Sequence, residues 1–286
     1  MLKYALLLIM LAATSYGWGT DDGNMGASNM GSVFLKSNDV ILTIIDAFSV
    51  PSAQQILGLD YQESDPYIAV MDNTSGLIRG IVPNTGTEIW TMSTPCSGTF
   101  GMCQTGAPDY IWYANSWSSS DIYRWDPDTR GWSVAFANPA QTLGRGLDFD
   151  PESGYIWEAD HAMGLWRIDE TGASTLYQPS WLLGAISGMS LFPYGDDLGI
   201  VISYYDFFYF HFYSFDGSSL NYIGEASAYV YNFTDSYGIT YNPVSDTFYW
   251  SHVVYPSNRV IAEMDYEFTS PSALEQCTWG SIKTGF

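Results

Sequence analysis

Polar, acidic and aromatic side chains recur at one position of a repeated sequence pattern, after the second short apolar run of each repeat. They are Asp72 and Asn73, Asn115 and Trp117, Asp160 and His161, Tyr205 and Asp206, and His252. A ring of such side chains suits recognition of a glycan or a peptide at a concave mouth. Carboxylates with a histidine also suit acid–base hydrolysis of a glycoside. Histidine and aspartate together are metal-ligand types.

These residues favour binding over catalysis, because no complete catalytic set accompanies them. A carbohydrate-active hydrolase or lyase that uses carboxylates and histidine at the mouth is the alternative function. Asp, Asn and His are also residues that turns prefer, so part of the pattern can be structural. No catalytic residue, resident metal or cofactor is expected, and Ca²⁺ is among the cations that the negative charge can attract. Asp60 and Asp148, in the first run of their repeats, are expected to face a central channel or the neighbouring repeat.

The repeat itself begins with a glycine followed by alternating apolar residues, a polar turn and an aromatic-rich run. The clearest copies cover residues 146–157 and 238–250, and the five glycines are 42 to 50 residues apart. These glycines are Gly58, Gly101, Gly146, Gly188 and Gly238. A period of about 40–50 residues made of short strands is typical of a β-propeller blade.

The third repeat divides into four strands joined by tight turns that contain Pro and Gly. The predicted strands are Leu147–Phe149, Tyr155–Ala159, Gly164–Ile168 and Ala173–Tyr177. The sequence therefore predicts an all-β propeller of five four-stranded blades. The fifth repeat lacks a clear fourth strand, and residues 40–46 are expected to supply it and to close the ring. Residues 279–283 are the competing choice, and a six-bladed ring with one degenerate blade is the alternative architecture.

Two short segments of the third repeat resemble repeats of the NHL, streptogramin-lyase-like and quinoprotein-like propellers. They are residues 146–157 and Asp169-Glu170-Thr171-Gly172. The resemblance spans most of the chain through short turn motifs. It implies the propeller fold. That group contains enzymes, ligand carriers and interaction scaffolds, so the resemblance implies little about activity.

The amino terminus has the pattern of an export signal. Lys3 precedes an apolar stretch that ends near Ala13, and Ser15 and Gly17 are small residues suited to cleavage. We predict a signal peptide over residues 1–17, a flexible leader over 18–32, the propeller over 33–270 and a tail over 271–286. The apolar stretch is shorter than the roughly 20 residues of a membrane span. The mature chain is expected to be extracellular, periplasmic or on the cell surface.

The chain carries 31 acidic and 9 basic residues, for a net charge of −22. Such a charge excludes nucleic acid and anionic lipid headgroups as ligands, because both are bound through clusters of Lys and Arg. The charge can serve solubility, or it can attract cations. The expected partners are a glycan, a peptide or a protein, bound by a monomer.

Two further expectations concern particular side chains. Cys96 and Cys103 lie in a Gly-rich loop of a chain expected to be exported, which predicts a disulfide and leaves Cys277 over. The aromatic stretch from Tyr204 to Phe215 is expected to form a hairpin of two strands buried between adjacent blades.

Overall fold

The computed structural model describes residues 40–269 except 63–65, 162–163, 181 and 183. The predicted signal peptide, leader, carboxyl-terminal tail and Cys277 lie outside the described residues. No helix among the described residues is long and apolar enough to cross a membrane.

The described chain forms five antiparallel sheets of four strands each. Blade 1 contains β2 (Ile56–Gln62), β3 (Tyr67–Asp72), β4 (Leu77–Val82) and β5 (Thr87–Ser93). Blade 2 contains β6 (Thr99–Gln104), β7 (Trp112–Ser116), β8 (Asp121–Asp126) and β9 (Gly131–Ala137). Blade 3 contains β10 (Gly144–Asp150), β11 (Tyr155–Asp160), β12 (Gly164–Ile168) and β13 (Ser174–Tyr177), preceded by the 3-10 turn η2 (Gln141–Leu143).

The last two blades complete the ring. Blade 4 contains β14 (Ile186–Tyr194), β15 (Asp197–Tyr204), β16 (Phe207–Phe215) and β17 (Leu220–Ser227). Blade 5 contains β18 (Phe233–Asn242), β19 (Thr247–Val254), β20 (Asn258–Phe268) and β1 (Val40–Ser49). The architecture is a five-bladed β-propeller, as predicted, and the strands of the third repeat agree with their predicted positions to within a few residues.

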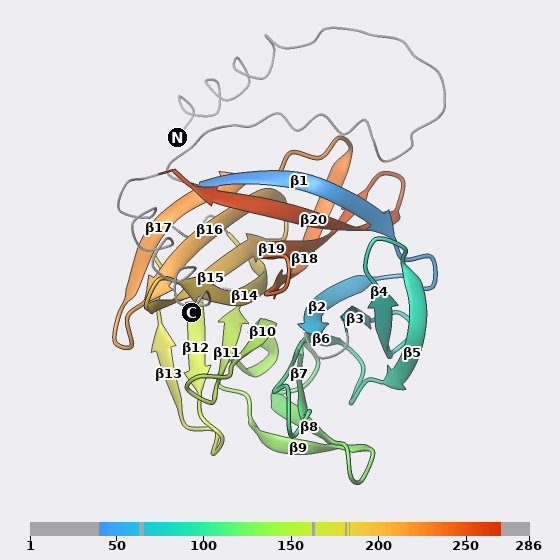
Figure 1. Ribbon diagram of the computed structural model, residues 1–286. Coiled ribbons are helices and arrows are strands. Elements are labelled where there is room, and N and C mark those ends of the chain that lie inside the picture. Colours follow the sequence, from blue (N-terminus) through green and yellow to red (C-terminus); the bar gives the residue numbers. More distant parts are fainter. Residues whose placement is uncertain (1–39, 63–65, 162–163, 181, 183, 270–286) are drawn as a thin grey trace, which may run out of the picture. The chain divides into compact units, whose positions relative to one another are not determined.

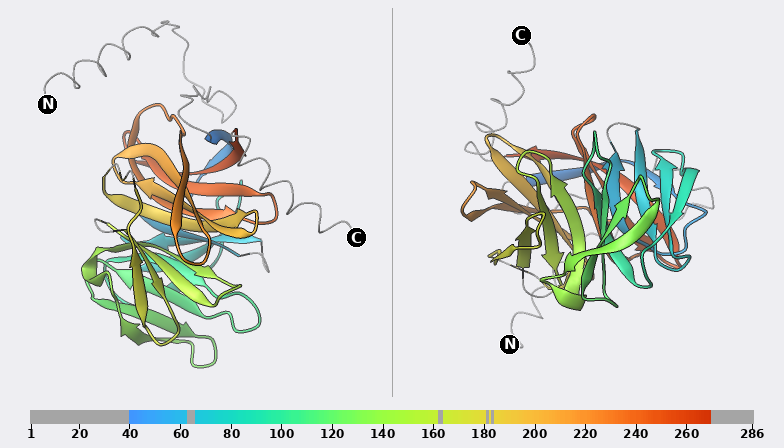
Figure 2. Two further views of the ribbon diagram at one scale, coloured as in Figure 1. Left: turned by 90° about the vertical axis from the view of Figure 1, so that its left-hand side faces the viewer. Right: turned by 90° about the horizontal axis from the view of Figure 1, so that it is seen from below.

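The ring is closed by the amino-terminal strand. β1 pairs antiparallel with β20, with Val40 opposite Phe268 and Ser49 opposite Val260. Figure 1 looks along the ring axis, with β1 at the rim and the first strand of each blade near the centre. The turned views of Figure 2 show the same twisted sheets side by side. Pairing β1 with β20 covers the edge that β20 would otherwise expose to other chains.

The repeat glycines allow the five inner strands β2, β6, β10, β14 and β18 to touch around the axis. A Cβ atom added at any of the five glycines would lie less than 3.0 Å from a backbone atom of the next inner strand. At Gly238, for example, the added atom would lie 2.7 Å from the backbone nitrogen of Leu59, which is how blade 5 meets blade 1. The glycine recurs in every repeat because a larger side chain at that position would collide with the next inner strand.

Apolar side chains between neighbouring sheets form the core. Blades 4 and 5 meet through the densest aromatic packing, in which the ring of Phe192 lies 5.4 Å from that of Phe248 and 6.1 Å from that of Phe268. Such pairs each stabilise a core by about 1 kcal/mol beyond their buried area.

The aromatic stretch of blade 4 differs from its prediction. The turn falls at Tyr205 and Asp206, so residues 207–215 form the single strand β16 rather than two strands. Phe210 and Phe212 are buried, whereas Phe207 remains 40% exposed.

The predicted disulfide is absent. Cys96 and Cys103 are both free thiols, and Cys103 is fully buried. Cys96 precedes the extended strand β6, and Cys103 lies near the end of that strand, opposite Tyr113 of β7. A disulfide needs Cα atoms within about 7 Å, whereas four residues of strand span roughly 13 Å.

Candidate functional site

A cavity of about 940 Å³ opens on the axis at the carboxyl ends of the five inner strands. Every blade contributes to its lining, from the inner strands and the turns that follow them. Six lining residues are acidic, namely Asp60, Asp148, Asp150, Glu152, Asp196 and Asp197. We call this cavity the acidic bowl. Its volume is in the range of small-molecule and peptide-side-chain sites.

Four of the five side chains that stand two residues after a repeat glycine form the floor of the acidic bowl, namely Asp60, Asp148, Ser190 and Thr240. The fifth, Cys103, is fully buried in the core between blades 2 and 3. Because side chains alternate along a strand, each lies on the same side as the glycine that touches the next blade. Three of them accept a hydrogen bond from the next blade. Leu191 N donates to Asp148 Oδ2 at 2.7 Å, Tyr241 N to Ser190 Oγ at 2.9 Å, and Tyr61 N to Thr240 Oγ1 at 3.0 Å.

Below this floor the axis is almost filled. The space between the five glycines and their neighbours is about 10 Å³, about enough for the centre of one water molecule. The two ends of the propeller are therefore separate surfaces, and a ligand in the acidic bowl cannot pass along the axis.

Asp148 is a carboxyl of the acidic bowl with a raised pKa. Burial, helped by the nearby charge of Asp150, raises the pKa of Asp148 to about 6, although donors from Leu191, Phe149 and Ser190 lower it. Ser190 Oγ donates to Asp148 Oδ2 at 2.9 Å, and Phe149 N donates to Oδ1 at 2.8 Å. Asp148 therefore changes charge near pH 6, and its orientation is held by three donors.

Aromatic side chains share the lining with these acids. Tyr61, Phe149 and Tyr241 are each partly buried and line the acidic bowl. Tyr61 stacks on Tyr249 with ring centroids 6.0 Å apart, which fixes one wall. No Lys, Arg or His is among the described residues that line the bowl.

The side chains predicted as a binding rim lie at the other end of the inner strands. Strand register shows this, since Asp72 pairs with Ile56 at the start of β2, and Asp160 with Gly144 at the start of β10. The last residues of the second strands in blades 1 to 4, together with His252 near the end of β19 in blade 5, are all buried, at 0–2% exposure. They are Asp72, Ser116, Asp160, Tyr204 and His252.

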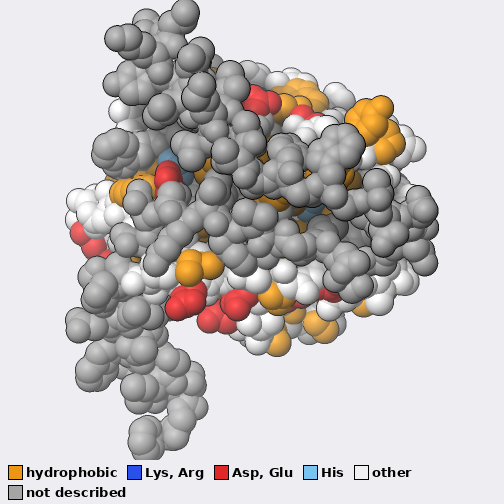
Figure 3. Space-filling model, turned by 90° about the horizontal axis from the view of Figure 1, so that it is seen from above, with side chains coloured by type: hydrophobic (Ala, Val, Ile, Leu, Met, Phe, Trp, Pro, Cys, Tyr) orange, Lys and Arg blue, Asp and Glu red, His pale blue; other side chains and the backbone are white. Residues whose placement is uncertain are grey.

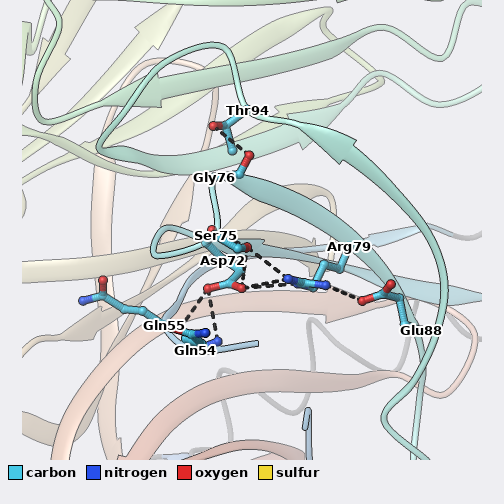
Figure 4. Close-up of polar contacts among 8 residues, drawn as sticks. All are labelled: Gln54, Gln55, Asp72, Ser75, Gly76, Arg79, Glu88 and Thr94. Atoms are coloured by element: carbon cyan, nitrogen blue, oxygen red, sulfur yellow. Dashed lines mark hydrogen bonds and ion pairs between the residues drawn. The ribbon is translucent and has the colours of Figure 1, made fainter. Parts of the chain in front are cut away.

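Asp72 organises the loops of blade 1 (Figure 4). It accepts hydrogen bonds from the backbone of Gln54 and Gln55, from Ser75 Oγ at 2.6 Å, and from Arg79, whose Nη2 lies 3.2 Å away. Arg79 also pairs with Glu88 at 2.5 Å. Burial tends to raise the pKa of Asp72, but these donors outweigh it and hold that pKa below its usual value.

We expect Asp72→Asn to lower the free energy of unfolding by about 2 kcal/mol, because the buried hydrogen bonds and the ion pair lose their charge. Chemical denaturation measures the change. Asp128→Asn, at an exposed turn, removes the same charge without a comparable network and is the control. Equal stabilities of the two variants would contradict a structural role for Asp72. Asn73 supports the same loops, as its Nδ2 donates to Gln55 Oε1 at 3.0 Å.

Asn115 joins blades 2 and 3 through a residue that the sequence analysis missed, Glu158. Asn115 Oδ1 accepts from Gly101 N at 2.7 Å, and its Nδ2 donates to Glu158 Oε1 at 2.7 Å. Asn138 Nδ2 donates to the same oxygen at 2.8 Å. Glu158 is fully buried, and its Oε2 has no hydrogen-bond partner among the described residues. Burial raises its pKa to about 8. The sequence signal that could have identified Glu158 is an acidic residue in the middle of an otherwise apolar strand.

The other predicted rim residues divide into separate groups. Asp160, His161 and Asp206 are near enough to interact electrostatically, and burial with Arg145 nearby lowers the pKa of His161 despite both acids. Tyr205 contacts Tyr237 through their hydroxyls at 3.3 Å. Trp117 is 37% exposed and packs edge-on against Phe100. His252 stacks on Trp250 at 4.2 Å, and burial lowers its pKa to about 3.

The structure brings Asp160, His161 and Asp206 near one another. Asp72 and Asn73 share the loops of blade 1, and the other predicted rim residues serve separate contacts. Among residues 40–269, apart from the undescribed gaps, no three His, Cys, Asp or Glu side chains are placed to hold a metal ion.

Comparison with solved structures identifies the same architecture. A chain from the crystal structure of a nidogen/laminin complex matches at a TM-score of 0.51 and 12% identity, over 84% of this chain and 98% of that one. The likeness is one of fold. A chain of hydrazine synthase from Kuenenia stuttgartiensis matches at 0.50 and 9% identity, over 77% of this chain and 65% of that one. Streptogramin B lyase matches at 0.45 and 12% identity, over 74% and 66%.

No protein-family model matches the chain. No curated protein matches it in sequence.

Proposed function

We propose that this chain is an exported, non-catalytic propeller that binds a peptide, protein or glycan ligand in the acidic bowl. The observation that carries the proposal is the concave lining of about 940 Å³, to which all five blades contribute polar side chains and four of them aromatic ones. Such a mixture on a rigid scaffold is typical of ligand sites. Export is supported by the signal-like residues 1–17.

The acidic bowl is a better candidate than the predicted rim for a physical reason. Asp72, Asn115 and His252 are buried, so a ligand would have to open the blades to reach them. In the acidic bowl Glu152 and Asp196 are exposed, while Asp148 and Asp150 are held by hydrogen bonds at fixed positions. Preformed polar groups reduce the entropy lost on binding.

A steric block tests the location. Glu152→Trp places an indole at the wall of the acidic bowl, and we expect it to weaken ligand binding by about tenfold or more. The assay is an immobilised panel of neutral oligosaccharides and of neutral and basic peptides. Asp206→Trp, at the opposite end, is the matched control and should leave binding unchanged. Loss of binding only in Asp206→Trp would overturn the proposal and return the site to the predicted rim.

One observation favours a second candidate, a carbohydrate-active hydrolase or lyase. Asp148 has a pKa of about 6 and lies beside Asp150 in the same cavity, so it can hold a proton near neutral pH and donate it as a general acid. In that case Asp148→Asn would retain glycan binding and lose glycan cleavage. A wild-type chain that binds an oligosaccharide without cleaving it would support the binding module instead.

A further inference from the structure

We propose that the acidic bowl binds the lysine or arginine side chains of a polypeptide. This inference rests on the proposed function and names its ligand class. It concerns the end of the propeller opposite the predicted rim.

Five of the bowl acids have no basic side chain of the described residues paired with them. The ion pairs found among the described residues are Arg79 with Asp72 and with Glu88, and His211 with Glu225. None includes Asp148, Asp150, Glu152, Asp196 or Asp197. Asp148 and Asp150 have hydrogen-bond donors from backbone amides and serine hydroxyls only. Several carboxylates in one concavity repel one another, and a cationic ligand removes that repulsion.

The chemistry of a basic side chain matches this lining. Ammonium and guanidinium groups carry several N–H donors and no acceptor, and the carboxylates of the acidic bowl are acceptors.

The aromatic part of the lining suits the rest of such a ligand. Tyr61, Phe149 and Tyr241 offer ring surface beside the acids. The long aliphatic stems of Lys and Arg pack on aromatic rings. Their charged ends are attracted to the ring faces by about 0.5–1 kcal/mol or more. An acidic bowl without aromatic walls would suit small hydrated cations, whereas this lining suits side chains with both an apolar stem and a charged end.

The experiment compares two capped peptides by calorimetry. One is Gly-Lys-Gly-Arg-Gly, and its matched partner has norleucine and citrulline in place of Lys and Arg. We expect the basic peptide to bind at least about tenfold more tightly, and its affinity to fall with added salt because the attraction is screened. A fall in affinity of about tenfold is expected in the doubly substituted Asp196→Asn, Asp197→Asn chain.

The control variant carries Asp206→Asn and Asp235→Asn, which remove the same charge at the opposite end. Equal affinity of the control and the Asp196, Asp197 variant for the basic peptide would overturn the inference, since binding would then follow net charge alone. If the neutral peptide or an oligosaccharide binds the acidic bowl as tightly, the ligand class is wrong while the proposed function stands. If no probe binds in a manner sensitive to Glu152→Trp, the proposed function fails as well.

Discussion

Replacement of Glu158 by Gln is expected to stabilise the protein increasingly as pH rises from about 4.5 to about 8. The folded-state pKa of Glu158 is raised to about 8 from the usual value of 4.5 because its carboxyl is buried between blades 2 and 3. A group whose pKa is raised on folding favours the folded state while it is protonated. That contribution is fully present below pH 4.5 and is lost as pH rises through 8.

The expected size is large for one side chain. A difference of one pKa unit corresponds to about 1.4 kcal/mol, so Glu158 should lower the free energy of unfolding by about 4 kcal/mol across this interval. The amide that Glu158→Gln introduces keeps an acceptor for Asn115 and Asn138 but does not ionise. Denaturant titrations of both proteins at several pH values give the difference directly, so that groups common to both cancel.

Glu170→Gln, at an exposed position of the same blade, controls for the loss of one negative charge from an acidic chain. A difference between wild type and Glu158→Gln that stays constant from pH 4.5 to pH 8 would contradict the burial argument. An equal slope in the Glu170→Gln control would attribute the effect to net charge.

The fold was predictable because its signals are local. The glycine of each repeat is required where two inner strands touch, so its period counts the blades. The strands of the third repeat followed from Pro and Gly turns between alternating residues. Residues 40–46 were assigned as the closing strand because they had no partner within their own repeat. These inferences need only the chain near each residue.

The location of the site was less predictable, because burial depends on neighbouring blades. Asp72 and His252 look like exposed polar turn residues in the sequence, yet Asp72 is covered by its loops and His252 by Trp250. The register that does locate the acidic bowl, two residues after the repeat glycine, was present at Asp60 and Asp148. The role of this position becomes visible only with the next blade in place. There Asp148 accepts from the amide of Leu191, and the equivalent Ser190 accepts from the amide of Tyr241.

Composition predicted that the surface is acidic, but it did not predict where the acidic side chains gather. The excess of acidic over basic residues is visible on the uncovered surface in Figure 3, where acidic side chains lie among hydrophobic ones. An overall negative charge alone is compatible with a role in solubility. The acidic bowl adds the information that several of these charges share one cavity with aromatic side chains.

Substitution of the axial glycine Gly101 by Ala is expected to destabilise the protein by about 3 kcal/mol or more. A Cβ atom there would overlap the backbone oxygen of Arg145 and approach Leu147 N to 2.9 Å, and both are backbone atoms that cannot rotate away. Blades 2 and 3 would have to separate, which loosens their shared core around Cys103 and Leu147. Overpacking of well-packed interiors typically costs about 1–3 kcal/mol, and contact with backbone places this case at the upper end.

A graded set of variants makes the Gly101 test specific to the axis. Gly131→Ala introduces the same methyl group at the start of β9, where the nearest atoms of Thr129 are 4.0 Å away, and should leave the midpoint of unfolding nearly unchanged. Gly238→Ala, whose closest contact is 2.7 Å, should fall between the two, which keeps the comparison measurable if Gly101→Ala does not fold. The floor of the acidic bowl is formed by the inner strands that touch at these glycines. Gly238→Ala should therefore also weaken ligand binding in the bowl. Wild-type stability in both axial variants would mean that the inner strands do not touch, and the geometry of the acidic bowl would then have to be abandoned along with the tight ring.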